Sequence, residues 1–205
     1  MQKNFLWLAL ATLIASTLPI KAQNSAQDST SKKWFIGSTL LLLGNFDKTN
    51  NPAYVQLNAG YRITHIDVVH VRFKRSVYAW PLGIPFGPSF DAPGLNYPGS
   101  ARIIAPQIGY QRFWWKGIYT SLYALNAFEK YMDEDKKKLG NGFTLYLDFY
   151  LGYQFKFLKN RFFFEPAIGC SYWPLRTNVP ASFKLVEKKW PNYFIQPGLD
   201  FGFNF

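Results

Sequence analysis

The final stretch of the chain, YFIQPGLDFGFNF at residues 193–205, alternates apolar side chains with polar or small ones. One face of this segment carries Tyr193, Ile195, Pro197, Leu199, Phe201, Phe203 and Phe205. The opposite face carries Gln196, Gly198, Asp200, Gly202 and Asn204. Successive side chains of a β-strand point to opposite sides, so the segment predicts a strand that separates an apolar from a polar environment.

Seven further segments upstream are predicted to be strands on the same grounds. Alternation is clear at 54–63, 67–80, 143–157 and 161–173, and only partial at 34–44, 101–115 and 117–131. In the first of the partial segments, Leu40 to Leu43 are apolar on both faces. Because Phe, Tyr and Val favour strands over helices, these segments indicate an all-β fold.

Short connections alternate with long ones along the chain. The short ones are 64–66, 116–117 and 158–160, and the long ones are 45–53, 81–100, 132–142 and 174–191. Five prolines from Pro81 to Pro98 exclude a ladder-forming strand from the second long connection, which favours eight strands over ten. Short turns at one end and long loops at the other are typical of bacterial transmembrane barrels. We therefore expect residues 34–205 to form an eight-stranded antiparallel up-and-down transmembrane β-barrel with short periplasmic turns and long extracellular loops.

Residues 1–22 predict a secretory signal peptide. Lys3 gives a basic start, and the mainly apolar stretch after it ends at Pro19, shortly before the expected cleavage after Ala22. A polar tail at 23–33 precedes the first strand. We expect export to the outer membrane, with a retained N-terminal membrane helix as the alternative.

The chain of 205 residues is basic, with 23 Lys and Arg against 12 Asp and Glu. Without Lys3 and Lys21 of the signal peptide, the formal net charge falls from +11 to +9. Nucleic acid is not an expected partner, because the chain is exported and its basic residues are scattered. The lone Cys170 excludes an internal disulfide framework and a cysteine-rich zinc site.

Aromatic residues gather at the predicted strand ends. We expect an interface girdle of Trp34, Trp80, Trp114, Trp115, Trp173, Trp190, Tyr193 and Phe205. The periplasmic members are Trp34, Trp114, Trp115 and Phe205, joined by Phe155, Phe162 and Phe203. The outer members are Trp80, Trp173, Trp190 and Tyr193, joined by Tyr131. Aromatic rings prefer the bilayer interface, although aromatic residues at strand ends can also be ordinary core residues.

With these features the chain resembles the small outer-membrane β-barrel proteins of Gram-negative bacteria, the group that includes outer-membrane proteins A and X. The resemblance covers about residues 34–205, and its most specific element is the alternating strand that ends at Phe205. In that family such an ending resembles the signal read by the barrel-assembly machinery, so the resemblance implies this machinery as a partner. The 81–100 loop and the segments 112–115 and 191–194 also look like an uncharacterised outer-membrane barrel family, which implies a fold and a place but no chemistry.

An eight-stranded barrel is narrow, and side chains fill its interior. The polar faces of the predicted strands place a set of titratable residues there, namely Arg62, His70, Arg72, Lys74, Asp148, Lys156, Glu165 and Asp200. Enclosed charges need partners. We expect a plug of ion pairs and hydrogen bonds in which Arg72 or Lys74 meets Asp148 or Glu165. The alternative is a gated small-solute pore or a small-ligand pocket.

The expected function is structural or surface-interacting, through the extracellular loops, among outer-membrane lipids and lipopolysaccharide. One alternative is a lipid A deacylase or acyltransferase at the outer leaflet, and another is an exported barrel that binds a lipophilic ligand. A lipid A enzyme of this size needs a histidine near the outer leaflet. The only histidines, His65 and His70, are both predicted near the periplasmic end.

The sequence predicts no catalytic, cofactor or metal site. Asp133, Glu134 and Asp135 lack the spacing of a calcium loop. The partner of the outer loops is not identified by the sequence. Phe86, Phe90, Tyr97 and Trp190, in the two longest loops, either form an outer binding platform or pack on one another.

Overall fold

A computed structural model describes residues 32–46, 51–78 and 97–205. The predicted signal peptide at 1–22, nearly all of the tail at 23–33, Trp80 and most of the proline-rich connection lie outside the described residues. Among the residues that are described, no helix has the length and apolar character needed to cross a membrane.

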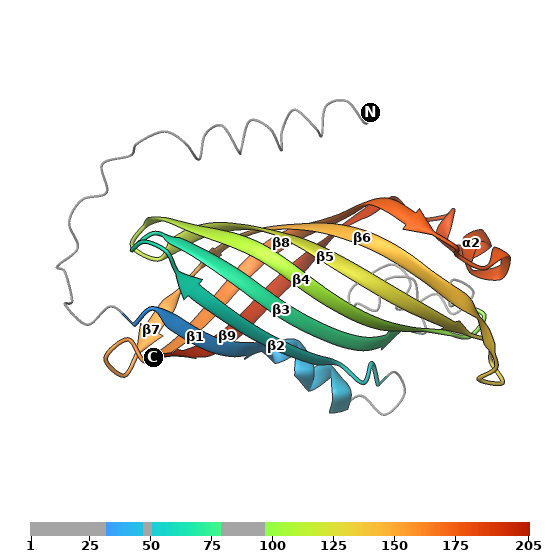
Figure 1. Ribbon diagram of the computed structural model, residues 1–205, viewed down its shortest axis with the longest axis horizontal. Helices are drawn as coiled ribbons and strands as arrows, with labels where there is room; N and C mark the ends of the chain where they lie inside the picture. Colours follow the sequence, from blue (N-terminus) through green and yellow to red (C-terminus); the bar gives the residue numbers. More distant parts are fainter. Residues whose placement is uncertain (1–31, 47–50, 79–96) are drawn as a thin grey trace.

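Strands make up most of the described chain (Figure 1). They are β1 (Trp34–Thr39), β2 (Val55–Arg62), β3 (Asp67–Tyr78), β4 (Ser100–Trp115), β5 (Ile118–Met132), β6 (Lys138–Tyr153), β7 (Phe155–Phe157), β8 (Phe162–Thr177) and β9 (Tyr193–Asn204). A 3-10 helix, η1 (Leu40–Phe46), follows β1, and α2 (Ala181–Glu187) lies between β8 and β9.

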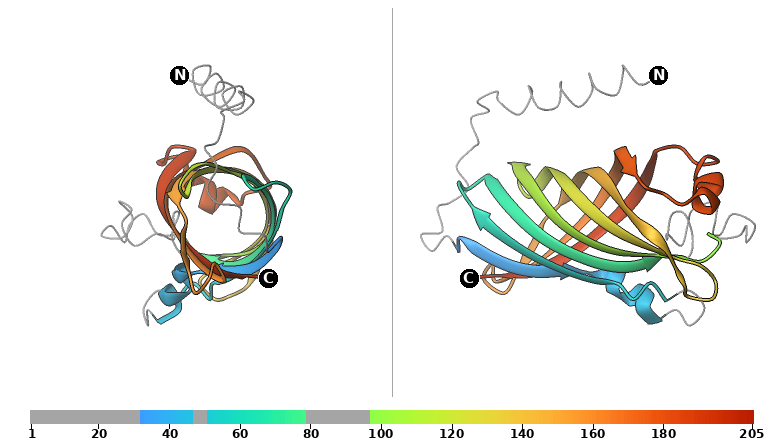
Figure 2. Two further views of the ribbon diagram at one scale, coloured as in Figure 1. Left: turned by 90° about the vertical axis from the view of Figure 1, so that its left-hand side faces the viewer. Right: turned by 45° about the vertical axis from the view of Figure 1, so that its right-hand side comes forward.

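Eight strands form a closed antiparallel ring, which confirms the predicted up-and-down barrel. Each strand from β1 to β5 pairs with the one after it, β6 pairs with β8, β8 with β9, and β9 with β1. The short strand β7 continues the line of β6 along β8. Viewed along the axis, the strands enclose a ring, and α2 is seen through it at the far end (Figure 2).

The first predicted strand, 34–44, is too long. β1 ends at Thr39, and the apolar residues after it belong to the 3-10 helix η1. The Oγ1 atom of Thr39 accepts a hydrogen bond from the backbone N–H of Leu41. Because Leu40 to Leu43 do not alternate, neither side of an extended chain would suit them, and the backbone turns instead.

The prediction of a long loop at 132–142 is wrong. β5 extends to Met132 and β6 begins at Lys138, so the connection is the short turn 133–137. In this turn an oxygen of the Asp133 side chain accepts the backbone N–H of Lys137 at 2.7 Å. The predicted strand 143–157 is interrupted at Gln154, whose backbone N–H donates to the carbonyl of Gly117 instead of continuing the ladder.

The two faces of the ring differ in chemistry, as the alternation predicts. The outer face carries exposed apolar residues on every strand, for example Leu57, Ile108, Leu151 and Ile195. The lumen holds polar residues between three apolar clusters. We call the end of the ring with the connections 63–66, 116–117 and 158–161 the short-turn end, and the opposite end, which carries α2, the loop end. The three clusters centre on Phe35 and Phe163 near the short-turn end, on Ile103 and Leu125 further along, and on Tyr131 and Phe183 at the loop end.

Glycines opposite inward-facing rings let the aromatic side chains fill the narrow lumen. Gly109 lies directly across from Tyr123, and a Cβ at Gly109 would lie 1.9 Å from that ring. Four similar cross-strand pairs are Phe35 with Gly60, Tyr119 with Gly152, Tyr150 with Gly169, and Phe163 with Gly202. Each inward glycine therefore provides the space that the facing ring occupies.

Candidate functional site

The middle of the lumen holds the polar network that the sequence predicts, but with different pairs. Arg72 on β3 forms an ion pair with Asp200 on β9, with 2.7 Å between Nη2 and Oδ2. The same nitrogen donates to the hydroxyl of Tyr123 at 2.6 Å, and the guanidinium lies over the Tyr123 ring. The expected pairing of Arg72 with Asp148 or Glu165 is wrong, because the ring closure places Asp200 closer.

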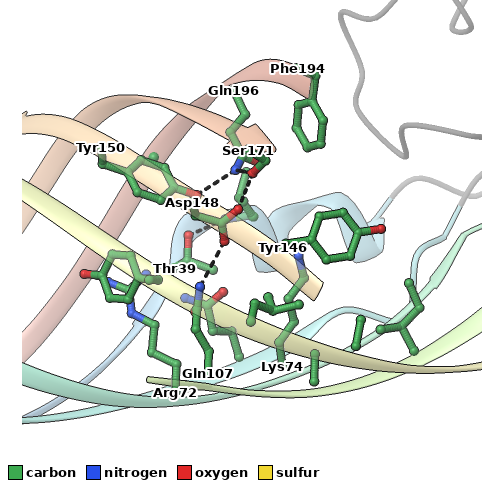
Figure 3. A pocket seen from close by; sticks show the side chains of 18 of the residues that line it. Thr39, Arg72, Lys74, Gln107, Tyr146, Asp148, Tyr150, Ser171, Phe194 and Gln196 are labelled. Atoms are coloured by element: carbon green, nitrogen blue, oxygen red, sulfur yellow. Dashed lines mark hydrogen bonds between the residues drawn. The ribbon is translucent and has the colours of Figure 1, made fainter. Parts of the chain in front are cut away.

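Asp148 is buried and is held by neutral donors (Figure 3). Gln107 donates to one carboxylate oxygen at 2.9 Å, and the hydroxyl of Ser171 donates to the other. Gln196 donates in turn to the oxygens of Ser171 and Tyr150, at 2.6 and 2.7 Å. Residues of β4, β6, β8 and β9 are joined across the lumen by this chain of hydrogen bonds.

Glu165 repeats this arrangement nearer the short-turn end. Its Oε1 atom accepts from Gln111 at 3.0 Å and from Gln154 at 2.6 Å. The buried carboxylate is therefore satisfied by two amides from the neighbouring walls, and not by a cation. Hydrogen bonds to an ionised group are among the stronger ones, so such donors offset part of the cost of burial.

The remaining predicted lumen residues occupy three different environments. Arg62 donates to the side-chain oxygen of Asn204 at 3.1 Å and lies near the rings of Phe35 and Phe113. Lys74 projects into the lumen, with its ammonium 5.2 Å from the Tyr54 ring centre. Lys156 on β7 pairs with the buried Phe163 and so shares the lumen-facing side, but it is exposed and therefore not enclosed.

The two histidines lie apart. His65 is exposed in the turn between β2 and β3. His70 is buried and packs edge-on between the rings of Phe35 and Tyr123, with centroid distances of 5.1 and 5.4 Å. Neither histidine therefore lies at the loop end of the ring. Among the described residues, no three His, Cys, Asp or Glu side chains are grouped in a way that suits a metal ion.

A cavity of about 100 Å³ lies beside the network. Its walls combine Arg72, Lys74 and Asp148 with apolar residues of the loop-end half, such as Ile103 and Leu125. Figure 3 shows Lys74 extending along this space toward Tyr146. The volume is enough for several water molecules.

The loop end is closed by α2 and a second charged cluster, which the sequence analysis missed. Arg176 on β8 forms an ion pair with Glu187 of α2 at 2.8 Å and approaches Glu129 of β5 at 3.9 Å. The Tyr97 hydroxyl also donates to Glu187, at 2.9 Å. Burial raises the pKa of Glu187 above its ordinary value, although Arg176 lowers it in part, and burial raises the pKa of Tyr97 well above its ordinary value.

The predicted aromatic girdle is only partly found on the outer surface. Trp34, Trp115, Tyr193 and Phe205 are exposed, and Trp114 is half-buried with its indole N–H donating to Thr120. The prediction that Trp173 belongs to the girdle is wrong, because Trp173 lines the cavity in the lumen and contacts Tyr146 and Phe194. Tyr131 is also a correction, because it is fully buried. Trp190 is half-buried after α2, and Trp80 lies outside the described residues.

The sequence leaves open whether the aromatic residues of the loops form an outer binding platform or pack on one another, and for Tyr97 the structure shows packing. It packs against Phe183 of α2, with 4.8 Å between ring centroids. Within the described part of the loops, this residue therefore contributes to closing the lumen and not to an exposed platform.

The network members that the sequence analysis missed lie mainly on β4 and β5. Gln107, Gln111 and Tyr123 alternate with outward residues, as a strand requires. Their segments looked irregular because the lumen face also carries Ile103, Ala105, Leu125 and Ala127, which are apolar. The signal was therefore present but masked, since both faces of these strands are partly apolar.

Comparison with known proteins yields no match to a family model, to a curated protein or to a solved structure.

Proposed function

We propose that the protein is an integral outer-membrane β-barrel of a Gram-negative bacterium, with a lumen closed by its own side chains. Its role is structural or surface-interacting, through the connections at the loop end. The single observation that carries this proposal is the apolar belt, which is the exposed outward face of the closed ring between its two charged edges. Outer-membrane lipids would surround this belt, and the barrel-assembly machinery would recognise β9 with its terminal Phe205.

The height of the belt fits a bilayer. On β4 the outward residues between Arg102 and Arg112 are Ile104, Pro106, Ile108 and Tyr110. At about 3.4 Å per residue and a strand tilt of about 40°, this interval spans about 26 Å along the barrel axis, close to the band of about 25 Å in outer-membrane barrels. On β3 the outward charges Asp67 and Arg75 likewise lie on either side of the outward apolar residues Val69, Val71 and Phe73.

The chemistry of the two faces supports the same proposal. Soluble monomers rarely expose continuous apolar surface beyond a few hundred Å², whereas every strand of this ring exposes apolar side chains outward. Buried ion pairs and hydrogen bonds occupy the lumen instead. A closed ring also leaves no open strand edge, which lipid would not tolerate.

The test is refolding into detergent, followed by circular dichroism and a gel-mobility comparison of boiled and unboiled samples. A β-type spectrum with a mobility shift on boiling is the expected result. A protein that remains monomeric and soluble without detergent would overturn the membrane proposal.

The closed lumen has a separate test in planar bilayers. Because hydrogen bonds join β4, β6, β8 and β9 across the lumen at Asp148, we expect no steady single-channel conductance from the inserted protein. A reproducible conductance would reject the closed lumen in favour of a small-solute pore, and would leave the membrane proposal intact.

A further inference from the structure

Four basic residues line one groove on the outer surface, at the loop-end edge of the apolar belt. They are Arg75 on β3, Arg102 on β4, Lys130 on β5 and Lys136 in the turn after β5. These three strands run side by side in the ring (Figure 1). All four side chains are exposed.

The register brings the strand cations close together. Arg102 lies directly across from Lys130, so their Cβ atoms are about 5 Å apart. Arg75 pairs with Ile104, one outward position along β4 from Arg102, which makes it a diagonal neighbour at about 7–8 Å. Like charges directly opposite each other destabilise a sheet, so this row favours an anion between the cations.

Within the described part of the chain, none of these four cations forms an ion pair. Glu129 is on the same wall of the groove, but its side chain points into the lumen toward Arg176 and Tyr131. The contrast with the other end of the same strands is clear, because there Arg112 pairs with Asp67 at 3.2 Å. On these strands, the outward cation at the short-turn edge thus has an acidic partner, and among the described residues the four cations at the loop-end edge do not.

The groove continues directly onto the apolar belt. Ile104 and Phe128 line it below the cations and are 50% and 55% exposed. The ring of Phe128 also packs at a tilt against Phe143 on the neighbouring strand, with 5.5 Å between ring centroids. An occupant must therefore place an anionic group at the rim and an apolar portion along the strands.

We propose that this groove binds a phosphorylated lipid of the leaflet at the loop end. Its phosphate contacts Arg75, Arg102 and Lys130, and its acyl chain lies on Ile104 and Phe128. Phosphate oxygens accept several charge-assisted hydrogen bonds from Arg and Lys, which is the counter-charge that the row lacks. The proposal rests on the membrane placement above, because only a lipid supplies both portions at this height.

The experiment measures lipid retained by the refolded protein in nanodiscs of zwitterionic phosphatidylcholine. The probes are lipid A with two phosphates, the same lipid with its phosphates removed, and inorganic phosphate, each detected by native mass spectrometry or by competition. The test variant is Arg102→Ala with Lys130→Ala. The control variant is Lys184→Ala with Lys188→Ala, which removes two exposed cations at the same end of the barrel but outside the groove.

We expect the bisphosphorylated lipid to bind the unmodified protein and the control alike. It should bind the test variant about thirtyfold more weakly, since two cations near the headgroup are lost. Removal of the lipid phosphates should weaken binding to a similar extent. Equal losses in both variants would reject a local site in favour of general attraction to a basic protein. Inorganic phosphate bound as tightly as the lipid would show an anion site without lipid recognition.

The mobility shift on boiling, measured for every variant, separates the two proposals. If all variants show the mobility shift but the test variant binds the bisphosphorylated lipid as well as the control does, the lipid site is rejected and the membrane proposal stands. The absence of a shift in the unmodified protein would overturn the membrane proposal itself.

Discussion

Ile108 and Gly109 are neighbours on β4, yet they meet opposite environments. Ile108 points outward and is 68% exposed, as one of many similar apolar residues in the belt. Gly109 points inward, where the ring of Tyr123 fills the space above it. The stability of the outer face depends on the overall apolar character of its residues. The stability of the lumen depends on which side chains face each other.

This difference predicts how each face responds to substitution. An apolar residue of the belt can be exchanged for another with little effect, because lipid has no fixed shape to match. A residue of the lumen has defined partners, and its loss leaves them unpaired or sterically displaced. Three predictions test this contrast, and two more concern the loop end.

The largest effect is expected for Arg72→Ala in the lumen. The substitution leaves the half-buried Asp200 carboxylate inside the lumen without its cation. Breaking a fully buried pair in this way costs about 3–5 kcal/mol, so we expect a loss toward the lower end of that range. The measurement is urea unfolding of the refolded protein in lipid or detergent. Arg75→Ala is the matched control, because Arg75 lies on the same strand but points outward at the rim. Equal losses for both variants would contradict the difference between the faces.

A charge placed in the belt is the next test. Ile108→Arg is expected to cost about 2–4 kcal/mol in a bilayer, because the side chain lies near mid-height on the lipid-facing side. Ile108→Val should cost less than about 1 kcal/mol. The measurement for both variants is the free energy of unfolding in lipid vesicles. If Ile108→Arg had no more effect than Ile108→Val, the outer face would not contact lipid at this position.

A smaller effect is expected when a methyl group is added inside the lumen. In Gly109→Ala the new Cβ would overlap the Tyr123 ring, and overpacking of this kind costs about 1–3 kcal/mol. Gly140→Ala is the control, because a Cβ there meets no atom within 4 Å. Thermal unfolding followed by circular dichroism should separate the two variants. Similar melting temperatures would show that Tyr123 can move aside without cost.

The sequence predicted the outer face better than the lumen for the same reason. The alternation from Tyr193 to Phe205 is local, so it identifies a strand and its two sides without knowledge of any neighbour. The partner of Arg72 is not local, because Asp200 reaches it only through closure of the ring by β1 and β9. The position of Trp173 near a strand end favours the interface girdle, and this prediction is wrong. Trp173 is two residues from Ser171 on β8, so the two side chains point to the same side, which is the lumen.

The loop end differs from both faces, since a short helix and not a strand completes it. Arg176 faces the two carboxylates of Glu129 and Glu187. Arg176→Ala would therefore leave like charges facing each other, and α2 should undock. Hydrogen exchange of residues 181–187 is the measurement, and faster exchange than in the unmodified protein is expected. Unchanged protection would mean that Phe183 alone holds the helix.

Glu187→Gln should have the smallest effect, which is a change in how the protection of α2 against hydrogen exchange depends on pH. Because burial raises the pKa of Glu187, the docked helix favours the protonated carboxyl more than the undocked helix does. This contribution to docking is present below the ordinary pKa of glutamate and is lost as the pH rises through the raised value. Protection of α2, corrected for intrinsic exchange rates, should therefore decrease over that interval in the unmodified protein and stay level in Glu187→Gln. An increase with pH would instead show that the ion pair with Arg176 outweighs the cost of burying the charge, and the helix would then be held chiefly by electrostatic attraction.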